Sequence, residues 1–578
     1  MLFKLLATAG RAAFKTVSEI NRVCHTSFSR QEEPVLDKID TPHASRTQYR
    51  DEATPAWRPW QTRFFLGLVG LVPLLVSWYT LHNQSIEGLD QAHHIMDGMF
   101  FRDLIVDHPF SHLKGYGLNY YAQYPALGFK FWPPFFPFIE GLFLSVFGMH
   151  IVVARWCLLA FGILLAVLIF LATRDSLGQW IAALTSMGVV TTSLFIEHLN
   201  TVMLEVPTLA MAFLTICLYQ RMVKRGHWQS WLEVLGFACI GAMTVYTKQT
   251  IIFIFPALCI DVLVNHRHLL RSRSTWVATT LIVLLCIPLL VFTVQFSPEN
   301  LVQSFGNQGD VYVKAHKVAS RWSIDGWTYY IWQVGYQCQI LLAGLALAAL
   351  GYCLVSRQFA RHNTLWAAWT ICWYLLFSYF DNKQPRFVTF VIPGVTILGC
   401  SFAWVLLKGG YWKQRIVFAG LTTIIVLQVL SGFRSALPPG ISGMDEIINE
   451  LFRVDKANIA FLGDYRQLFI PFVRIHDPER SVYTLRLERL LSSEMPVKAS
   501  DIAHRYRIKW FLIEPASADA RHLPSARQHE LTTEPFELVG TREFGTHSKR
   551  IKLDIYRYRG SWAERMAPIS YTGLNHSL

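Results

Sequence analysis

The stretch LEVPTLAMAFLTICLYQRMVKRGHWQSWLEVLGFACIGAMTVYT, residues 204–247, determines the fold class that we expect for the whole chain. It contains two apolar runs, 204–222 and 231–247, separated by a short loop rich in Lys and Arg. About 20 apolar residues span a bilayer as a helix, and basic side chains in short loops stay on the cytoplasmic side. Two apolar runs joined by a basic turn therefore predict a polytopic membrane protein.

Apolar runs of the same kind recur along the chain and predict about eleven transmembrane helices. The expected spans lie at 64–81, 151–173, 179–196, 204–222, 231–247, 250–265, 276–295, 329–355, 362–380, 386–407 and 414–432. With the N-terminus in the cytoplasm, Lys and Arg gather in every second loop, on the cytoplasmic side. The apolar run 135–148 is short and contains Pro137 and Glu140. We therefore expect it to form a juxtamembrane helix, because counting it as a span would move the later basic loops outside.

Three regions follow from this topology. Residues 1–62 are polar and are expected to form a cytoplasmic tail, and residues 63–435 form the transmembrane domain, whose first outer loop is 82–150. Residues 436–578 are more polar and contain the short β-like runs NIAFLG, SVYTL, KWFLIE and IKLDIYRY between helical stretches. This alternation predicts a small α/β domain, and the outward direction of the last span makes it extracytoplasmic. The expected fold class is thus an all-α polytopic membrane protein with juxtamembrane helices and a small C-terminal α/β domain.

The composition supports a membrane protein and argues against a nucleic-acid partner. Of the 578 residues, 52% are hydrophobic and only 16% are charged, whereas soluble domains carry about a quarter charged residues. The net charge of +13 includes many basic side chains in short loops, where they orient the chain in the membrane. Ten cysteines are scattered without the spacing of a zinc site, and none follows Cys400.

The first outer loop is the segment richest in candidate functional residues. In SIEGLDQAHHIMDGMFFRDL, helical spacing places Asp90, His93, His94 and Asp97 on one face. One interpretation is a solvated acidic helix at the membrane surface. Another is a divalent-cation site made of Asp90, His94 and Asp97, since these residue types are reasonable metal ligands. The third is a catalytic carboxylate in a loop that a rigid scaffold holds in place.

Other candidate residues are also expected at the outer ends of helices. Glu205 stands at the mouth of a span, where an ionisable group indicates function unless it simply reaches water. Lys248, Lys383 and Arg386 are outer cations flanked by apolar sequence, suited to a phosphate or to lipid headgroups. The segment NYYAQYPALGFKFWPPFFPFIEG is typical of an interfacial aromatic belt or of a groove that holds a lipid chain and a sugar. Its candidate substrate-positioning residues are Tyr120, Tyr121, Tyr124, Trp132, Pro133 and Pro134.

The order of these short motifs resembles the GT-C superfamily of membrane glycosyltransferases. The resemblance covers about residues 64–432 and is strongest to the bacterial branch similar to protein mannosyltransferases and the lipid A aminoarabinose transferase. Asp90-Gln91 matches the family's Asp-Glu pair, so Asp90 stands at the position of the catalytic Asp. Glu205 matches the second acidic residue, and Arg386 matches the late basic residue near the lipid phosphate. Trp132-Pro133-Pro134-Phe135 replaces the family's Lys-Pro-Pro-Leu, which leaves Lys130 or Lys248 as substitutes for the missing Lys.

This resemblance implies transfer of a sugar from a polyprenyl-phosphate donor, by direct displacement with inversion, on the outer face of a bacterial inner membrane. Asp90 is the expected general base, and Arg386 and Lys248 are expected to stabilise the leaving phosphate. The acceptor can be a lipid, a glycan or a protein, and neither the sugar nor the need for a divalent cation follows from the sequence. The main alternative is a transporter or flippase of lipid-linked sugars, which should show inverted repeats that we do not find. A third reading, a non-catalytic scaffold for the C-terminal domain, leaves the outer charges unexplained.

Overall fold

The computed structural model describes most of the chain from residue 59 to residue 567. The residues outside this description are 1–58, 130, 229, 299–319, 382, 407–410, 436–439, 488–489, 491–497, 518–529, 547–548 and 568–578. The predicted cytoplasmic tail therefore lies almost wholly outside the described residues. Contacts divide the chain into two units, 1–57 and 58–578, and the structure described below belongs to the second unit.

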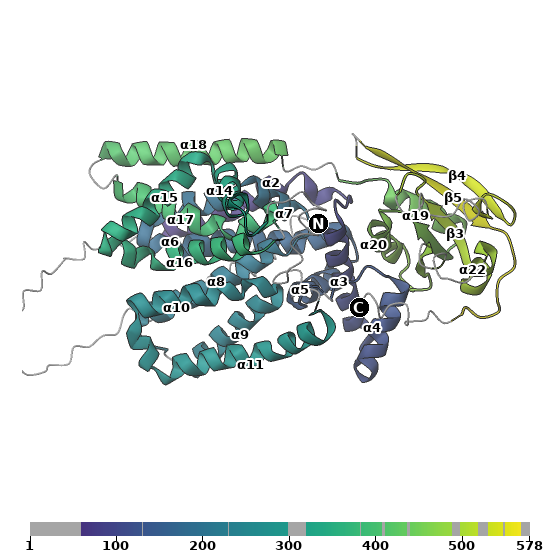
Figure 1. Cartoon of the computed structure of the whole chain (residues 1–578), viewed down its shortest axis with the longest axis horizontal. Coiled ribbons are helices and arrows are strands. Elements are labelled where there is room, and N and C mark those ends of the chain that lie inside the picture. The colour runs from purple at the N-terminus through teal and green to yellow at the C-terminus, as the bar shows by residue number, and fades with distance from the viewer. Residues whose placement is uncertain are drawn as a thin grey trace, which may run out of the picture. The chain divides into compact units, whose positions relative to one another are not determined.

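The apolar runs fold into helices, as the sequence predicts (Figure 1). These helices are α2 (Pro59–Ser77), α6 (Ile151–Val190), α8 (Glu205–Arg225), α9 (Trp231–Thr247), α10 (Ile254–Asn265), α11 (Arg273–Phe296), α14 (Ile324–Cys338), α15 (Ile340–Val355), α16 (Arg357–Tyr379), α17 (Ile392–Leu406) and α18 (Tyr411–Ser435). Among the described residues, five helices are long and apolar enough to cross a membrane: Pro59–Ser77, Ile151–Val190, Glu205–Arg225, Arg273–Gln295 and Arg415–Gly432. The chain is therefore a mostly helical membrane protein with several candidate spans, and the total of about eleven stays a prediction.

Two places show how backbone conformation divides apolar sequence. The prediction of one continuous helix over 329–355 is wrong, because Gln339 has a φ of 65° and separates α14 from α15. By contrast, the predicted separation of 151–173 from 179–196 is confirmed within α6. Gly178 has a φ of 75°, which favours glycine, and the two halves fold back on each other. The Ser186 hydroxyl of the second half donates a hydrogen bond of 2.6 Å to the Ala166 carbonyl of the first half.

The first outer loop forms three helices, α3 (Leu89–Asp107), α4 (Leu113–Gln123) and α5 (Phe135–Phe147). Helix α5 has 13 residues, fewer than a bilayer span requires, and it packs against α3. Two glycines allow this close approach. A Cβ at Gly98 would lie 2.6 Å from the Glu140 carboxyl carbon, and a Cβ at Gly141 would lie 2.8 Å from the Arg102 backbone nitrogen. The apolar run 135–148 is thus a short helix held on α3.

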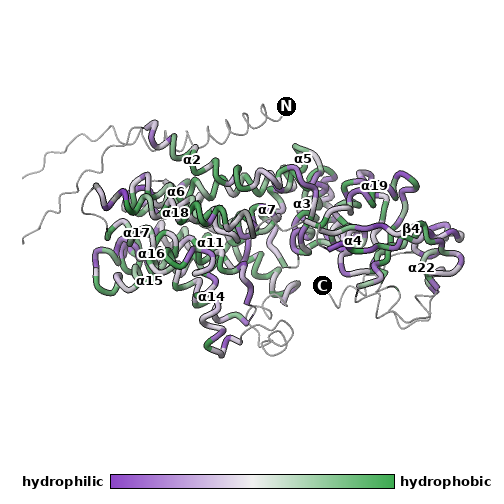
Figure 2. The backbone as a smooth tube through the Cα atoms, turned by 90° about the horizontal axis from the view of Figure 1, so that it is seen from above, coloured by the Kyte–Doolittle hydropathy of each residue, from purple (hydrophilic) through white to green (hydrophobic). Residues whose placement is uncertain are grey.

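The C-terminal region is a mixed five-stranded sheet with helices, as predicted. The strands are β1 (Asn458–Leu462), β2 (Thr484–Arg486), β3 (Ile508–Ile513), β4 (Phe536–Gly545) and β5 (Arg550–Tyr558), in the order β2-β1-β3-β5-β4. The pairs β1–β2 and β1–β3 are parallel, and the pairs β3–β5 and β4–β5 are antiparallel. Its helices include α19 (Met444–Val454), α20 (Arg466–His476) and α22 (Ala499–Tyr506). Figure 2 shows more hydrophilic residues around α19 and β4 than along helices such as α6.

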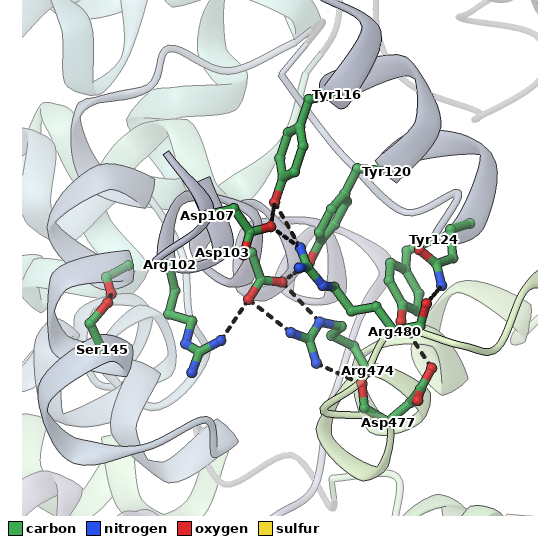
Figure 3. Close-up of polar contacts among 12 residues, drawn as sticks. Arg102, Asp103, Asp107, Tyr116, Tyr120, Tyr124, Ser145, Arg474, Asp477 and Arg480 are labelled. Carbon is green, nitrogen blue, oxygen red and sulfur yellow. Dashed lines mark hydrogen bonds and ion pairs between the residues drawn. The ribbon is translucent and has the colours of Figure 1, made fainter. Parts of the chain in front are cut away.

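Ion pairs, one of them buried, hold the C-terminal domain against α3 and α4 (Figure 3). Arg474 of α20 donates to both carboxylate oxygens of Asp103 on α3, at 2.8 and 2.9 Å, and both side chains are only 1% exposed. The Tyr120 hydroxyl also donates to Asp103, at 2.9 Å. Arg480 pairs with Asp107 at 2.5 Å at the end of α3. A buried charge is stable only when it is paired and hydrogen-bonded, so these contacts fix α20 on α3.

Hydrogen bonds from side chains to backbone carbonyls extend the same contact toward the segment after α4. The Gln123 amide donates to the carbonyls of Arg480 and Val482, and the Thr484 hydroxyl donates to the Gln123 carbonyl at 2.7 Å. Arg486 donates to the Pro125 carbonyl at 3.0 Å. The first outer loop and the C-terminal domain therefore share a continuous polar interface.

Candidate active site

Four of the predicted charged residues come together at one end of the membrane helices. Asp90 lies in the first turn of α3, and Glu205 begins α8. Lys248 directly follows α9, and Arg386 lies in the short 3-10 helix η5 (Pro385–Phe390). All four stand at helix ends, where a charged side chain can leave the apolar environment of a span. The structure thus brings these four residues together, although they are far apart in the sequence.

The four residues form two ion pairs. Arg386 Nη1 lies 2.5 Å from Asp90 Oδ2, and both side chains are partly exposed. Lys248 Nζ donates to Glu205 Oε1 at 2.6 Å, and the Glu205 side chain is fully buried. The charge of Arg386 also acts on Glu205, and that of Asp90 acts on Lys248, so the two pairs belong to one electrostatic cluster.

Aromatic and polar groups surround this cluster. Lys248 Nζ lies 5.5 Å from the Phe390 ring centroid, and the guanidinium carbon of Arg386 lies 5.5 Å from that of Phe387. Rings at this distance stabilise cations in a poorly hydrated place. His198, in helix α7 (Ser193–Asn200), lies within hydrogen-bond distance of the Thr389 hydroxyl, at 3.2 Å. Burial lowers the pKa of His198 to about 4, so this histidine is neutral at physiological pH.

A cavity of about 1350 Å³ opens at this cluster and continues between apolar helices. Its polar end contains Asp90, His93, Trp132, Lys248, Gln384 and Arg386. Its apolar wall comes mainly from α9, α10 and α11, and includes Val245, Phe253, Phe255, Leu258, Ile282, Leu289 and Leu290. At the opposite end it reaches Trp228, Leu270 and Trp276, near the starts of α9 and α11. The cavity thus joins two cations to an apolar space that follows the helices over their length.

The face of α3 that carries His93, His94 and Asp97, as predicted, packs against the segment that follows α4. The His93 ring nitrogen Nδ1 lies 2.8 Å from the Ala126 carbonyl oxygen, and the Gly128 backbone N–H donates to Asp97 at 2.8 Å. The His94 and Trp132 rings are in edge contact, with centroids 4.5 Å apart. Burial lowers the pKa of His94 to about 3 and raises that of Asp97 well above its usual range. Burial thus favours the neutral form of both side chains, which position the loop and Trp132.

The divalent-cation alternative finds no support in this arrangement. Within the described part of the chain, no group of three or more His, Cys, Asp and Glu side chains is placed to hold a metal ion. Asp97 and His94 instead contact Gly128 and Trp132, while Asp90 pairs with Arg386.

Several predicted site residues lie elsewhere. Lys383 donates to the carbonyls of Phe377 and Ser378 at the end of α16 and is not part of the cavity wall. Tyr120 and Tyr124 are buried in the contact with the C-terminal domain, where they donate to Asp103 and Asp477. The other predicted residues outside the cavity wall are Glu205, His94, Asp97, Tyr121, Pro133 and Pro134; Pro133 and Pro134 lead into α5. Lys130 lies outside the described residues.

One polar residue of the cavity that the sequence did not predict comes from the C-terminal domain. Gln467, in the first turn of α20, lines the polar end together with Asp90 and His93. It comes from the C-terminal domain, and a single uncharged amide in a polar domain carries no recognisable signal in the sequence. Only the packing of α20 on α3 brings it to the cavity.

Comparisons with known proteins agree with this geometry. Residues 132–292 match a family model described as dolichyl-phosphate-mannose-protein mannosyltransferase. Among solved structures, ArnT from Cupriavidus metallidurans bound to undecaprenyl phosphate is similar, with a TM-score of 0.53 and 13% sequence identity over 88% of this chain and 99% of that one. The apo form of ArnT gives a TM-score of 0.53 and 13% identity over 86% of this chain and 98% of that one.

A more distant likeness is to the archaeal oligosaccharyltransferase AglB from Archaeoglobus fulgidus, with a TM-score of 0.49 and 10% identity over 79% of this chain and 69% of that one. No curated protein sequence matches the chain. The family match over residues 132–292 and the ArnT-like fold confirm the resemblance read from the motifs. Residues 132–292 thus match the family described as dolichyl-phosphate-mannose-protein mannosyltransferase, and the fold of the chain is similar to that of ArnT.

Proposed function

We propose that the protein transfers a sugar from a polyprenyl-phosphate donor to an acceptor on the outer face of the membrane. The observation that carries this proposal is the position of Arg386 and Lys248 at the polar end of a long apolar cavity. A polyprenyl phosphate has the matching distribution of charge, with an anionic head and a long hydrocarbon tail. Arg offers two parallel donors to a phosphate, and Lys adds a point charge.

The apolar wall of the cavity fits the tail of such a donor. Its side chains come mainly from α9, α10 and α11, with few polar groups between the two ends. The fold similarity to ArnT supports the same assignment, because that protein was solved in complex with undecaprenyl phosphate. The head of the donor then lies beside Asp90, which lines the cavity next to both cations.

The reaction that we infer is a direct displacement at the anomeric carbon. An acceptor hydroxyl or amide loses its proton to the Asp90 carboxylate while its oxygen or nitrogen forms a bond to that carbon. The bond from the anomeric carbon to the phosphate oxygen breaks, and its electron pair stays on the lipid phosphate. Arg386 and Lys248 stabilise that added negative charge in a site of low dielectric. Attack from the side opposite the phosphate inverts the configuration at the sugar.

The ion pair between Arg386 and Asp90 connects donor binding to base activation. In the ligand-free protein, the Arg386 guanidinium engages the Asp90 carboxylate at 2.5 Å. A donor phosphate at Arg386 competes for the same N–H groups. Donor binding thus frees Asp90 to accept the proton of the acceptor.

Glu205 has a different role in this mechanism. Its buried carboxylate holds the Lys248 ammonium at 2.6 Å, and the charge of Arg386 acts on it as well. A lysine on a flexible stem needs such a partner to stay in place at the head of an apolar cavity. Glu205 therefore positions Lys248 for the leaving phosphate.

We infer the side of the membrane on which the charged cluster lies from the loops at the other end of the same helices. The loops after α8 and α10 carry Lys and Arg and are expected in the cytoplasm, which puts the charged cluster and the C-terminal domain outside. Single cysteines at Arg225 and at Val539, in a cysteine-free background, test this with an impermeant reagent on intact cells. Labelling at position 539 alone supports the outer face, and labelling at position 225 alone overturns it.

The function is tested with purified protein and a panel of radiolabelled polyprenyl-phosphate sugars. We expect one donor to be consumed, with free polyprenyl phosphate as a product, and Arg386→Ala to lower its consumption. Lys383→Ala is the matched control, since it removes a cation that lies outside the cavity wall. A lipid-linked sugar that crosses vesicle membranes without being consumed would instead support the transporter alternative.

A further inference from the structure

The C-terminal domain contributes a side chain to the polar end of the cavity. Gln467 lines this end beside Asp90 and His93, and its side-chain amide interacts with the His93 ring. An amide offers two donor hydrogens and an acceptor oxygen with two lone pairs. Gln467 can therefore interact with His93 and still bind a further polar group.

The position of Gln467 is set by the way in which α20 lies on α3. Gln467 contacts His93 near the start of both helices, and Arg474 binds Asp103 two turns later. The two helices therefore run side by side in the same direction. Residues 467 and 474 are seven apart and share one face of α20. The buried pair of Arg474 and Asp103, shown in Figure 3, thus fixes the distance of Gln467 from the cluster.

Gln467 enters the cavity from the side of the C-terminal domain, whereas the lipid phosphate is assigned to the side of the membrane helices. Lys248 follows α9, and the apolar wall for the donor tail comes from α9, α10 and α11. In Figure 1, α3 lies between these helices and the C-terminal sheet. A displacement with inversion brings the nucleophile to the face of the sugar opposite the leaving phosphate. The acceptor therefore approaches from the side on which Gln467 lies.

We propose that Gln467 is an acceptor-binding residue, and that the C-terminal domain forms one wall of the acceptor site. This inference rests on the proposed function. The amide of Gln467 binds a hydroxyl or amide group of the acceptor next to the group that attacks, and Asp90 takes the proton. Precise positioning of the nucleophile is a large part of catalysis, so a single well-placed hydrogen bond affects acceptor use.

The test separates acceptor use from donor use in the full-length protein. The donor is the polyprenyl-phosphate sugar that the wild type consumes, and the acceptor probe is a detergent extract of source-cell membranes. Three quantities are measured: the extract concentration that gives half-maximal transfer, the affinity for undecaprenyl phosphate, and the slow hydrolysis of donor by water. The variants are Gln467→Ala, the shorter amide Gln467→Asn, and the neighbouring control Arg466→Ala, whose side chain is not in the cavity wall.

We expect Gln467→Ala to raise the half-saturating extract concentration at least fivefold, with undecaprenyl phosphate affinity and donor hydrolysis within twofold of the wild type. Gln467→Asn should fall between Gln467→Ala and the wild type, and Arg466→Ala should match the wild type. An unchanged half-saturating concentration in Gln467→Ala overturns the inference. So does an equal loss of transfer and donor hydrolysis, which indicates a structural role. If the wild type itself consumes no donor, the proposed function fails, and that outcome is distinct from both.

Discussion

The Arg386 guanidinium lies 2.5 Å from the Asp90 carboxylate, across a separation of 296 residues in the sequence. Both side chains line the same cavity, and each has a different task in the proposed reaction. Arg386 is the cation for the donor phosphate, and Asp90 is the base for the acceptor. Their pairing in the ligand-free protein means that each must release the other before transfer begins.

This exchange predicts that removing the charge of Asp90 improves phosphate binding. In Asp90→Asn, Arg386 no longer has a carboxylate partner, so a phosphate meets less competition for its N–H groups. We expect Asp90→Asn to bind undecaprenyl phosphate about three- to tenfold more tightly, an effect of roughly 0.6–1.4 kcal/mol. The measurement is equilibrium binding in detergent or nanodiscs. Equal or weaker binding by Asp90→Asn, with the protein folded, would contradict the exchange.

Arg386 itself is expected to provide most of the hydrogen bonding to the phosphate. Arg386→Ala should weaken donor binding by about 1.5–3 kcal/mol, the usual contribution of a hydrogen bond to a charged group. Arg386→Lys should recover only part of this loss, because the two parallel donors of the guanidinium are absent. Donor affinity and transfer rate at subsaturating donor check both statements. Wild-type rates in Arg386→Ala would show that the phosphate lies elsewhere.

The pair of Lys248 and Glu205 is expected to control stability as well as activity. Glu205→Gln leaves the buried Lys248 ammonium without its carboxylate partner. Breaking a buried ion pair in this way lowers the free energy of unfolding by about 3–5 kcal/mol. The double variant Glu205→Gln with Lys248→Met should regain much of the stability but bind donor poorly. Thermal unfolding of the two variants and of Lys248→Met separates these effects. A double variant less stable than Glu205→Gln alone would mean that the lysine charge is not what destabilises the single variant.

A pH dependence is expected from Glu87, in the loop before α3. Burial raises its pKa to about 8, despite the opposing charge of Arg155. The folded protein thus holds a proton on Glu87 that the unfolded chain releases above a pH of about 4.5. The contribution of Glu87 to the free energy of unfolding is complete below that pH and is lost as the pH rises toward 8. Glu87→Gln has no such loss, so its advantage in melting temperature over the wild type should grow between pH 5 and pH 8. A constant difference across this range would show that Glu87 is ionised in the folded protein.

The sequence predicted the helices well because the length of an apolar run determines whether it can form a membrane helix. It failed at Gln339, where the run stays apolar while the backbone adopts a positive φ. Strand β4 was also missed. Its sequence FELVGTREFG contains three charged residues, and much of the strand is exposed beside β5.

The charged residues of the site could be predicted, but their partners could not. An ionisable side chain at the end of an apolar helix is costly and therefore indicates function. This criterion identified Asp90, Glu205, Lys248 and Arg386. Lys383 satisfied the same criterion, yet its ammonium binds the carbonyls at the end of α16. Tyr120 belongs to a buried contact with Asp103 that depends on the docking of a domain more than 300 residues later. Such contacts follow from tertiary packing and leave no local pattern.

The most direct test of the account is the rate of donor consumption by Asp90→Asn at saturating polyprenyl-phosphate sugar and acceptor extract. Glu87→Gln is the matched control, since it changes the nearest other carboxylate along the chain, which is not in the cavity wall. A positioned general base contributes about 10²–10⁴-fold to the rate. We expect Asp90→Asn to be slower by that factor while Glu87→Gln stays near the wild-type rate. Near-wild-type turnover by a folded Asp90→Asn variant would contradict the assignment of Asp90 as the base.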